Sequence, residues 1–110
     1  MNRADSADLI LNTVASTTGT VISCWNRYVS ATIDVNLSGS GTVLFEGTTT
    51  GIWKPILATN MDNTTTADST SSSGLFRVPV AGLSAMRCHL STISSGMATV
   101  TGIFTTHHGN

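Results

Sequence analysis

Apolar and polar residues alternate along much of the chain, so that every second side chain is apolar. This two-residue period is typical of antiparallel strands that bury one face and expose the other. The clearest segment spans residues 29–37, whose inward face would carry Val29, Ala31, Ile33, Val35 and Leu37. Similar patterns elsewhere predict further strands with inward-facing Val43, Phe45, Phe76, Val78, Val80, Met86, Cys88, Leu90, Ala98, Val100 and Phe104.

Glycine, proline and polar residues separate these segments. The run GTTTG at residues 47–51 predicts a hairpin turn, because glycine readily adopts positive φ. Pro55 and Pro79 lack a backbone donor, so each is expected to mark an edge strand, with a bulge as the alternative at Pro55. Gly102 is expected at a close approach or a bulge. Residues 59–74 are rich in Thr, Ser, Asn and Asp and are expected to form one long loop.

These signals predict an all-β chain of about eight short strands, arranged as a jelly-roll-like antiparallel β-sandwich. We expect an N-terminal arm at residues 1–8, one β-sandwich domain at residues 9–106 and a frayed tail at residues 107–110. Around residues 9–14 a short helical turn and a strand are both open alternatives.

The composition supports this fold class and excludes some partners. Charged residues make up only 10% of the chain, the net charge is −1, and 33 of the 110 residues are Ser or Thr. Dispersed basic residues offer no electrostatic footprint for nucleic acid. No apolar run approaches the length of a membrane span, so we expect neither a nucleic-acid nor a membrane partner. A net charge near zero favours self-association.

Cys24 and Cys88 each lie in an apolar segment. We expect both thiols to be reduced and buried, because free cysteines pack as small apolar side chains. A disulfide between strands is the alternative, and it requires a suitable Cα separation and an oxidising compartment. Residues 1–16 lack the features of a secretory signal, which favours a protein made in a cytoplasm.

No arrangement of residues predicts catalysis. Serine does not occur in a Gly-x-Ser-x-Gly turn, and His107 and His108 lie in the tail, a poor place for a preorganised base. A glycosidase needs two carboxylates facing each other across a cleft. Asp34 and Glu46 are the acidic pair expected on adjacent strands, but both are expected to face solvent. The close-spaced Cys and His pairs of a zinc site are also missing. We therefore expect no enzyme, no metal and no cofactor.

Three aromatic side chains fall outside the predicted inward faces, namely Trp25, Tyr28 and Trp53. Exposed together, they could form a platform on which a sugar ring stacks. Alternatively, Trp53 caps one end of the core. The second interpretation is favoured, because the other aromatic residues already fall on inward faces.

Two runs of the sequence carry a resemblance to a known group of proteins. They are GSGTVLFEGTTTGIWKPI at residues 39–56 and GLFRVPVAGLSAMRCHLSTISSGMATVTG at residues 74–102. Together they resemble a pattern found in small β-sandwich proteins of tailed bacteriophages. In that pattern a Thr-Val-x-Phe-Glu-Gly strand leads through a turn to a Trp, and a Gly-Leu-Phe-Arg-Val strand and an Arg-bearing strand follow.

Within that group, a single neutral β-domain of this size is similar to capsid decoration proteins, also called cement or staple proteins. The resemblance implies a jelly roll, self-association as a dimer or trimer, and the major capsid protein as the partner. It also implies a place on the capsid surface of the virion after synthesis in the host cytoplasm, bridging capsid subunits without catalysis.

Candidate contacts with the capsid or another partner are the N-terminal residues and the proline-marked edges, namely Asn2, Arg3, Asp5, Pro55 and Pro79. The alternative function is a carbohydrate- or receptor-binding module of a phage tail. Under that alternative, Trp25, Tyr28 and Trp53 would be the ligand platform.

Overall fold

The computed structural model describes residues 4–25 and 27–106, and the regular elements among them are all β-strands. The eleven strands in this part of the chain are β1 (Ala4–Thr13), β2 (Ile22–Ser23), β3 (Tyr28–Leu37), β4 (Gly41–Thr48), β5 (Lys54–Pro55), β6 (Ala58–Asn60), β7 (Thr66–Ala67), β8 (Ser69–Thr70), β9 (Gly74–Pro79), β10 (Ala85–Ile93) and β11 (Ala98–Thr106). Four of them, β2, β5, β7 and β8, have only two residues each. The longer strands other than β1 correspond to the segments in which apolar and polar residues alternate.

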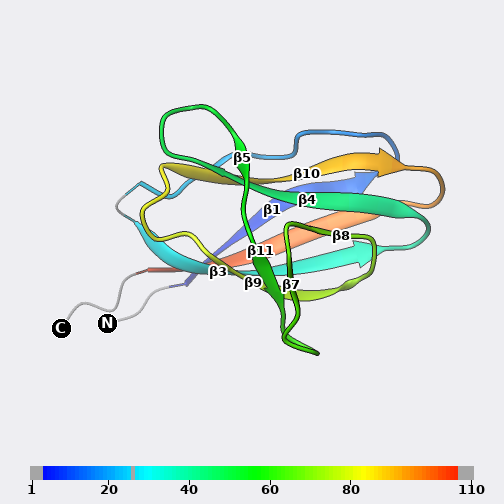
Figure 1. Cartoon of the computed structure of the whole chain (residues 1–110). Coiled ribbons are helices and arrows are strands. Elements are labelled where there is room, and N and C mark those ends of the chain that lie inside the picture. Colours follow the sequence, from blue (N-terminus) through cyan, green and yellow to red (C-terminus); the bar gives the residue numbers. More distant parts are fainter. Residues whose placement is uncertain (1–3, 26, 107–110) are drawn as a thin grey trace.

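The strands form two antiparallel sheets that pack as two layers (Figure 1). The six-stranded sheet has the order β1-β11-β3-β9-β6-β7. The five-stranded sheet has the order β2-β10-β4-β5, and β8 also pairs with β4. Consecutive strands β3 and β4 lie in different sheets, as do β9 and β10. The predicted all-β antiparallel sandwich is therefore confirmed.

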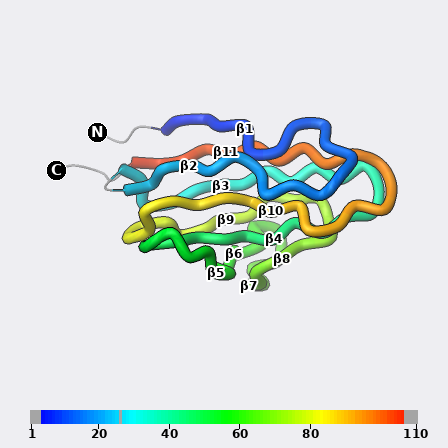
Figure 2. Tube along the Cα trace, turned by 90° about the horizontal axis from the view of Figure 1, so that it is seen from above, coloured from blue at the N-terminus to red at the C-terminus, as the bar shows by residue number. Residues whose placement is uncertain are grey.

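Turns close the sandwich at its two ends, as Figure 2 shows from above. At one end β1 begins and β11 ends, and the turns at residues 49–53 and 80–84 lie there; we call it the termini end. At the other end lie the turns at residues 38–40 and 94–97; we call it the hydroxyl end because serine dominates these turns.

Phenylalanine side chains from both sheets meet in the core. The ring centroids of Phe45 on β4 and Phe76 on β9 are 5.4 Å apart, with the planes tilted by 47°. A tilted pair at this distance contributes about 0.5–1.5 kcal/mol beyond the buried area. Phe45, its neighbour Val43, and Ile33 on the facing sheet are fully buried. The predicted inward orientation of Phe45 is confirmed.

Gly102 occupies the close approach that its position in β11 predicts. It lies opposite Ile33 on β3. A Cβ atom at Gly102 would lie 3.0 Å from Ile33 Cδ1 and 3.0 Å from Phe104 Cε1. The missing side chain therefore makes room for two core side chains at once.

The N-terminal segment differs from the expected arm. Residues 4–8 belong to β1, which runs from Ala4 opposite Thr105 to Thr13 opposite Ala98. Backbone pairing with β11 requires no apolar side chains, so the polar residues of this segment carry no strand signal of their own. Of the two alternatives for residues 9–14, the strand is correct through Thr13. Residues 1–3 and the expected tail at 107–110 lie outside the described residues.

The expected long loop at residues 59–74 contains three short strands instead. Strand β7 pairs with β6, and β8 pairs with β4. Between β6 and β7, the Asp62 amide donates to Asn60 Oδ1 at 2.8 Å, and the Thr65 amide donates to Asn63 Oδ1 at 3.1 Å. Such bonds between side chain and backbone form tight turns without apolar burial. For this reason the polar composition of residues 59–74 predicts only a loop.

The two prolines have different positions in their sheets. Pro55 lies in β5 at an edge of the five-stranded sheet, as predicted. Pro79 does not mark an edge strand, because β9 lies between β3 and β6. The Val80 amide donates to the Val29 carbonyl on the β3 side, so the Pro79 nitrogen faces the β6 side. Pairing with β6 ends at Arg77, and no ladder bond is lost at Pro79.

Both cysteines are free and buried. The register pairs Ser23 with Ala85 and Ile22 with Met86, which puts Cys24 opposite Ser84. Cys24 is therefore about four residues, or about 13 Å, away from Cys88 along the ladder. That distance is too long for a disulfide, whose Cα atoms lie about 4.4–6.8 Å apart.

We predict that Phe45→Ala lowers the free energy of unfolding by about 3–5 kcal/mol, because it empties a fully buried aromatic site. Urea denaturation measures this loss. Leu75→Ala is the matched control, since Leu75 is 47% exposed on the outer face of the other sheet, and it should change stability by no more than about 0.5 kcal/mol. A loss below about 1 kcal/mol for Phe45→Ala would contradict the core assignment.

We also predict that stability falls with pH above the ordinary cysteine pKa. Burial raises the pKa of Cys24 to about 11 and the pKa of Cys88 to about 12, from 9.0 in the unfolded chain. Above pH 9.0 the unfolded chain loses thiol protons that the folded chain retains, so unfolding is favoured as pH rises toward 12.

Urea denaturation at about pH 8 and about pH 10.5 measures this dependence. Cys88→Ala should make the pH-dependent loss smaller than in the unmodified protein, whatever its effect at the lower pH. Equal losses in the two proteins would show that the Cys88 thiol does not contribute.

Candidate functional site

Three turns meet at the termini end and are joined by hydrogen bonds. The Cys24 amide donates to the Ser84 carbonyl at 2.9 Å, and the Ser84 amide donates to the Thr48 carbonyl at 2.9 Å. The Gly51 amide donates to Thr48 Oγ1 at 2.7 Å, which closes the turn between β4 and β5. These bonds fix the connection after β2, the turn after β9 and the β4–β5 turn relative to one another. The three turns therefore lie side by side and together make up the surface of this end.

Large apolar side chains are exposed on this surface. Trp25 is 67% exposed and Ile52 is 69% exposed. A Cβ atom at Gly47 would lie 2.7 Å from Leu83 Cδ1, so the glycine allows Leu83 to pack onto β4. A shallow hollow of about 300 Å³ beside it is lined by Gly47, Thr48, Thr49, Thr50, Ile52, Lys54, Pro55, Ile56 and Leu83. Single exposed apolar side chains are normal on a protein surface, whereas several grouped on adjacent turns are a candidate binding surface.

The partner contacts that the sequence predicts fall at or near this end where the structure describes them. Asp5 lies near the start of β1, and its Oδ2 accepts a hydrogen bond of 2.8 Å from the Tyr28 hydroxyl. Pro79 is the last residue of β9, directly before the turn at 80–84, and Pro55 follows the β4–β5 turn. Asn2 and Arg3 lie outside the described residues.

The three aromatic residues of the predicted platform do not share one surface. Tyr28 is buried, with its ring centroid 5.3 Å from that of Phe104. A register shift at the start of β3, opposite Thr106, accompanies this inward orientation, which simple alternation does not predict. Trp25 is exposed in the connection between β2 and β3, whereas Trp53 is half-buried beside the five-stranded sheet.

Trp53 belongs to a cluster on the outer face of the five-stranded sheet, which we call the Trp53 cluster and which comprises Trp53, Glu46, Arg87 and His89. Arg87 Nε donates to Glu46 Oε1 at 2.8 Å. The Arg87 Cζ atom lies 4.2 Å from the centroid of the Trp53 ring. His89 Nδ1 lies 3.6 Å from Glu46 Oε2.

Alternation along β4 and β10 produces this arrangement. Phe45 and Cys88 point inward, so Glu46 and Arg87 point outward, and the two lie opposite each other in the ladder. Their side chains are only 16% and 17% exposed, so their attraction is less screened by water than that of a surface pair. Stacking of a guanidinium on an indole contributes a further 0.5–2 kcal/mol, roughly. The Glu46 carboxylate balances the charge of Arg87, and the cluster is close to neutral when His89 is neutral.

The predicted inward positions of Met86, Cys88 and Leu90 imply that Arg87 and His89 face outward, as they do. The sequence does not predict the partners of these two side chains. The Glu46–Arg87 pair joins residues 41 positions apart, and no local pattern reveals such a contact. The expectation that Asp34 and Glu46 lie on adjacent strands is wrong, because β3 and β4 belong to different sheets. Asp34 instead accepts a hydrogen bond of 3.0 Å from Asn36 Nδ2.

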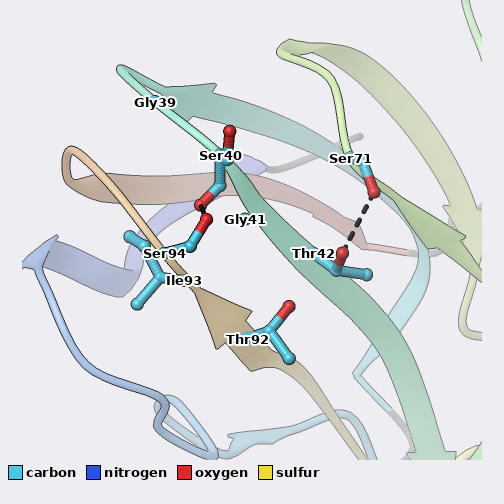
Figure 3. Close-up of a pocket in the computed structure, with 8 residues that line it drawn as sticks. All are labelled: Gly39, Ser40, Gly41, Thr42, Ser71, Thr92, Ile93 and Ser94. Carbon is cyan, nitrogen blue, oxygen red and sulfur yellow. Dashed lines mark hydrogen bonds between the residues drawn. The ribbon is translucent and has the colours of Figure 1, made fainter.

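The hydroxyl end contains a second hollow, of about 380 Å³ (Figure 3). Its lining residues are Gly39, Ser40, Gly41, Thr42, Ser71, Thr92, Ile93 and Ser94. The hydroxyl oxygens of Thr42 and Ser71 lie 3.0 Å apart, and the Ser94 amide donates to the Ser40 carbonyl at 2.9 Å. These polar groups already bind one another and tie the turns together. Serine recurs in three separate turns, at residues 38–40, 71–73 and 94–95. This recurrence is the only signal in the sequence that points to the hollow.

Within residues 4–25 and 27–106 the structure offers neither a cluster of metal ligands nor a membrane-spanning helix. No group of three or more His, Cys, Asp or Glu side chains is arranged to hold a metal ion. No helix in these ranges is long and apolar enough to cross a membrane.

Comparisons with known proteins identify the fold. No protein-family model matches the chain, and no curated protein matches it. The SPBc2 prophage-derived protein YomS has a similar structure, with a TM-score of 0.88 and 18% sequence identity over 96% of this chain and 95% of YomS. The PBSX exported protein XepA gives a TM-score of 0.90 and 19% identity over 94% of this chain, which spans only 38% of XepA. At this level of identity the likeness shows a shared fold.

We predict that replacing Gly39 by alanine lowers stability more than the same replacement at Gly74, because the turns of the hydroxyl end are tightly packed. A Cβ atom at Gly39 would lie 2.3 Å from the Ser95 carbonyl oxygen, so Gly39→Ala must push two turns apart. We expect a loss of about 1–3 kcal/mol in urea denaturation. At Gly74 the nearest atom would be 3.5 Å away, so Gly74→Ala should change stability by no more than about 1 kcal/mol. Similar losses in both variants would contradict the close packing of the Gly39 turn.

Proposed function

We propose that this chain is a phage-encoded structural protein that decorates the outside of a capsid and bridges neighbouring major capsid protein subunits. The observation that carries the proposal is the fold likeness, over almost the whole chain, to two proteins of prophage origin. YomS is matched over 95% of the length of its chain. A prophage-derived protein chain therefore consists almost entirely of a sandwich of this size.

The termini end supports a docking role. Trp25 and Ile52 project from turns whose backbones are held together by hydrogen bonds. Interfaces depend on a few aromatic or aliphatic anchors that become fully buried, surrounded by contacts that exclude water. The low charge of the chain adds little repulsion against a partner of either sign. A rigid, apolar end of this kind fits a recessed site between neighbouring subunits of a shell.

The mechanism of stabilisation follows from mass action. A protein that binds the assembled shell better than free subunits shifts the equilibrium toward the shell. Self-association into a small symmetric oligomer would present several copies of the termini end at once. Several weak contacts on a repeating surface then hold the oligomer more tightly than one contact could.

The test is to mix the purified protein with undecorated heads of the phage or prophage that encodes it, and to count bound copies per head. We expect binding to saturate at a simple multiple of the shell symmetry. Decorated heads should withstand a higher temperature before they release DNA. Size-exclusion chromatography with light scattering measures the oligomeric state of the free protein.

A matched pair of variants tests the docking surface. Trp25→Ser combined with Ile52→Ser should lower occupancy at least about tenfold at the same protein concentration, since two buried anchors are removed. Val14→Ser is the control, because Val14 is 66% exposed but follows β1 at the hydroxyl end. Absent or unsaturable binding would overturn the decoration role. Equal binding of both variants would overturn the choice of the termini end.

A further inference from the structure

The Trp53 cluster has hydrogen-bonding capacity that the fold does not use. Arg87 donates through Nε to Glu46, and its other guanidinium N–H groups make no hydrogen bond within residues 4–25 and 27–106. These groups are not sealed in the interior, because no unpartnered side-chain nitrogen or oxygen is buried in that part of the chain. His89 is 29% exposed at its side chain and faces Glu46 through Nδ1 alone. The cluster therefore presents oriented donors and acceptors to solvent.

The indole of Trp53 supplies an apolar surface beside these polar groups. Its ring covers the guanidinium of Arg87 at 4.2 Å. No other ring or cation stacks on it among the described residues. The side chain is half-buried, so the indole both packs on the sheet and keeps contact with solvent.

We propose that the Trp53 cluster binds a neutral sugar ring. The C–H face of a pyranose is apolar and stacks on indole, while its hydroxyl groups both donate and accept hydrogen bonds. Arg87 provides donors, Glu46 provides acceptors, and His89 provides a further ring nitrogen. The internal pairing of Glu46 with Arg87 leaves little net charge, which favours a neutral sugar over an acidic one. This proposal concerns a different surface from the termini end and does not depend on capsid decoration.

The geometry of the cluster is set before any ligand arrives. The Arg87 guanidinium is held on one side by Glu46 and on another by Trp53, so little rotamer freedom remains to be lost on binding. The same contacts also attach the β4–β5 turn to the sheet. A purely structural role would therefore explain a loss of stability on mutation, but it would not produce binding of a sugar.

The test is isothermal titration calorimetry of the full chain with three defined probes. They are maltoheptaose, chitopentaose and an oligogalacturonate, which represent neutral, N-acetylated and acidic sugars. We expect at least one of the two uncharged probes to bind saturably, with a dissociation constant below about 10 mM. The acidic probe should bind more weakly than the better neutral probe.

Three variants locate the site. Trp53→Ala should abolish the binding, and His89→Ala, which leaves the Glu46–Arg87 pair intact, should weaken it several-fold. Trp25→Ala is the control and should bind as the unmodified protein does, because Trp25 lies in a separate turn. Folding of each variant is checked by urea denaturation.

Three outcomes would overturn the proposal. Failure of both uncharged probes to bind removes the sugar site. Preference for oligogalacturonate identifies an anion site at Arg87 instead. Binding that persists unchanged in both Trp53→Ala and His89→Ala places any sugar site elsewhere.

Discussion

The contact between the inward faces of the two sheets is the interaction on which the rest of the structure depends. Phe45 from one sheet meets Phe76 from the other, and sheets packed face to face lie about 10 Å apart. At that spacing a core side chain that is too small leaves a cavity and one that is too large causes strain, and both lower the stability of the fold. Gly102 illustrates this constraint, because its missing Cβ leaves room for Ile33 and Phe104. The contact is long-range in the sequence, because Phe45 and Phe76 are 31 positions apart.

Burial of one face determines what the other face can do. Each inward residue of β4 and β10 forces its neighbour outward, and this alternation places Glu46, Arg87 and His89 together on a solvent-facing surface. Only 10% of the residues are charged. The Trp53 cluster brings two of these few charged side chains, Glu46 and Arg87, together beside a tryptophan ring. Its position follows from the core and not from any local motif.

The termini end and the Trp53 cluster share one element, the turn between β4 and β5. Ile52 belongs to the exposed apolar surface of the termini end, and Trp53 belongs to the cluster on the sheet face. The turn is anchored by the Gly51 amide, which donates to Thr48 Oγ1. A partner that covers the termini end would therefore lie next to the Trp53 cluster without having to occupy it. The hydroxyl end differs from both, because its polar groups bind one another.

The sequence by itself determined the fold class, the inward residues of the main strands, the edge position of Pro55 and the close approach at Gly102. These features depend on the two-residue period of a strand and on the backbone chemistry of glycine and proline, which are local properties. Only the tertiary structure decided that residues 4–8 form part of β1 and that residues 59–74 contain strands. Polar segments are held there by backbone pairing with strands distant in the sequence. The inward orientation of Tyr28 and the pairing of Glu46 with Arg87 likewise depend on register between strands. Register is set by the packing of the whole sandwich, so no single segment of the sequence encodes it.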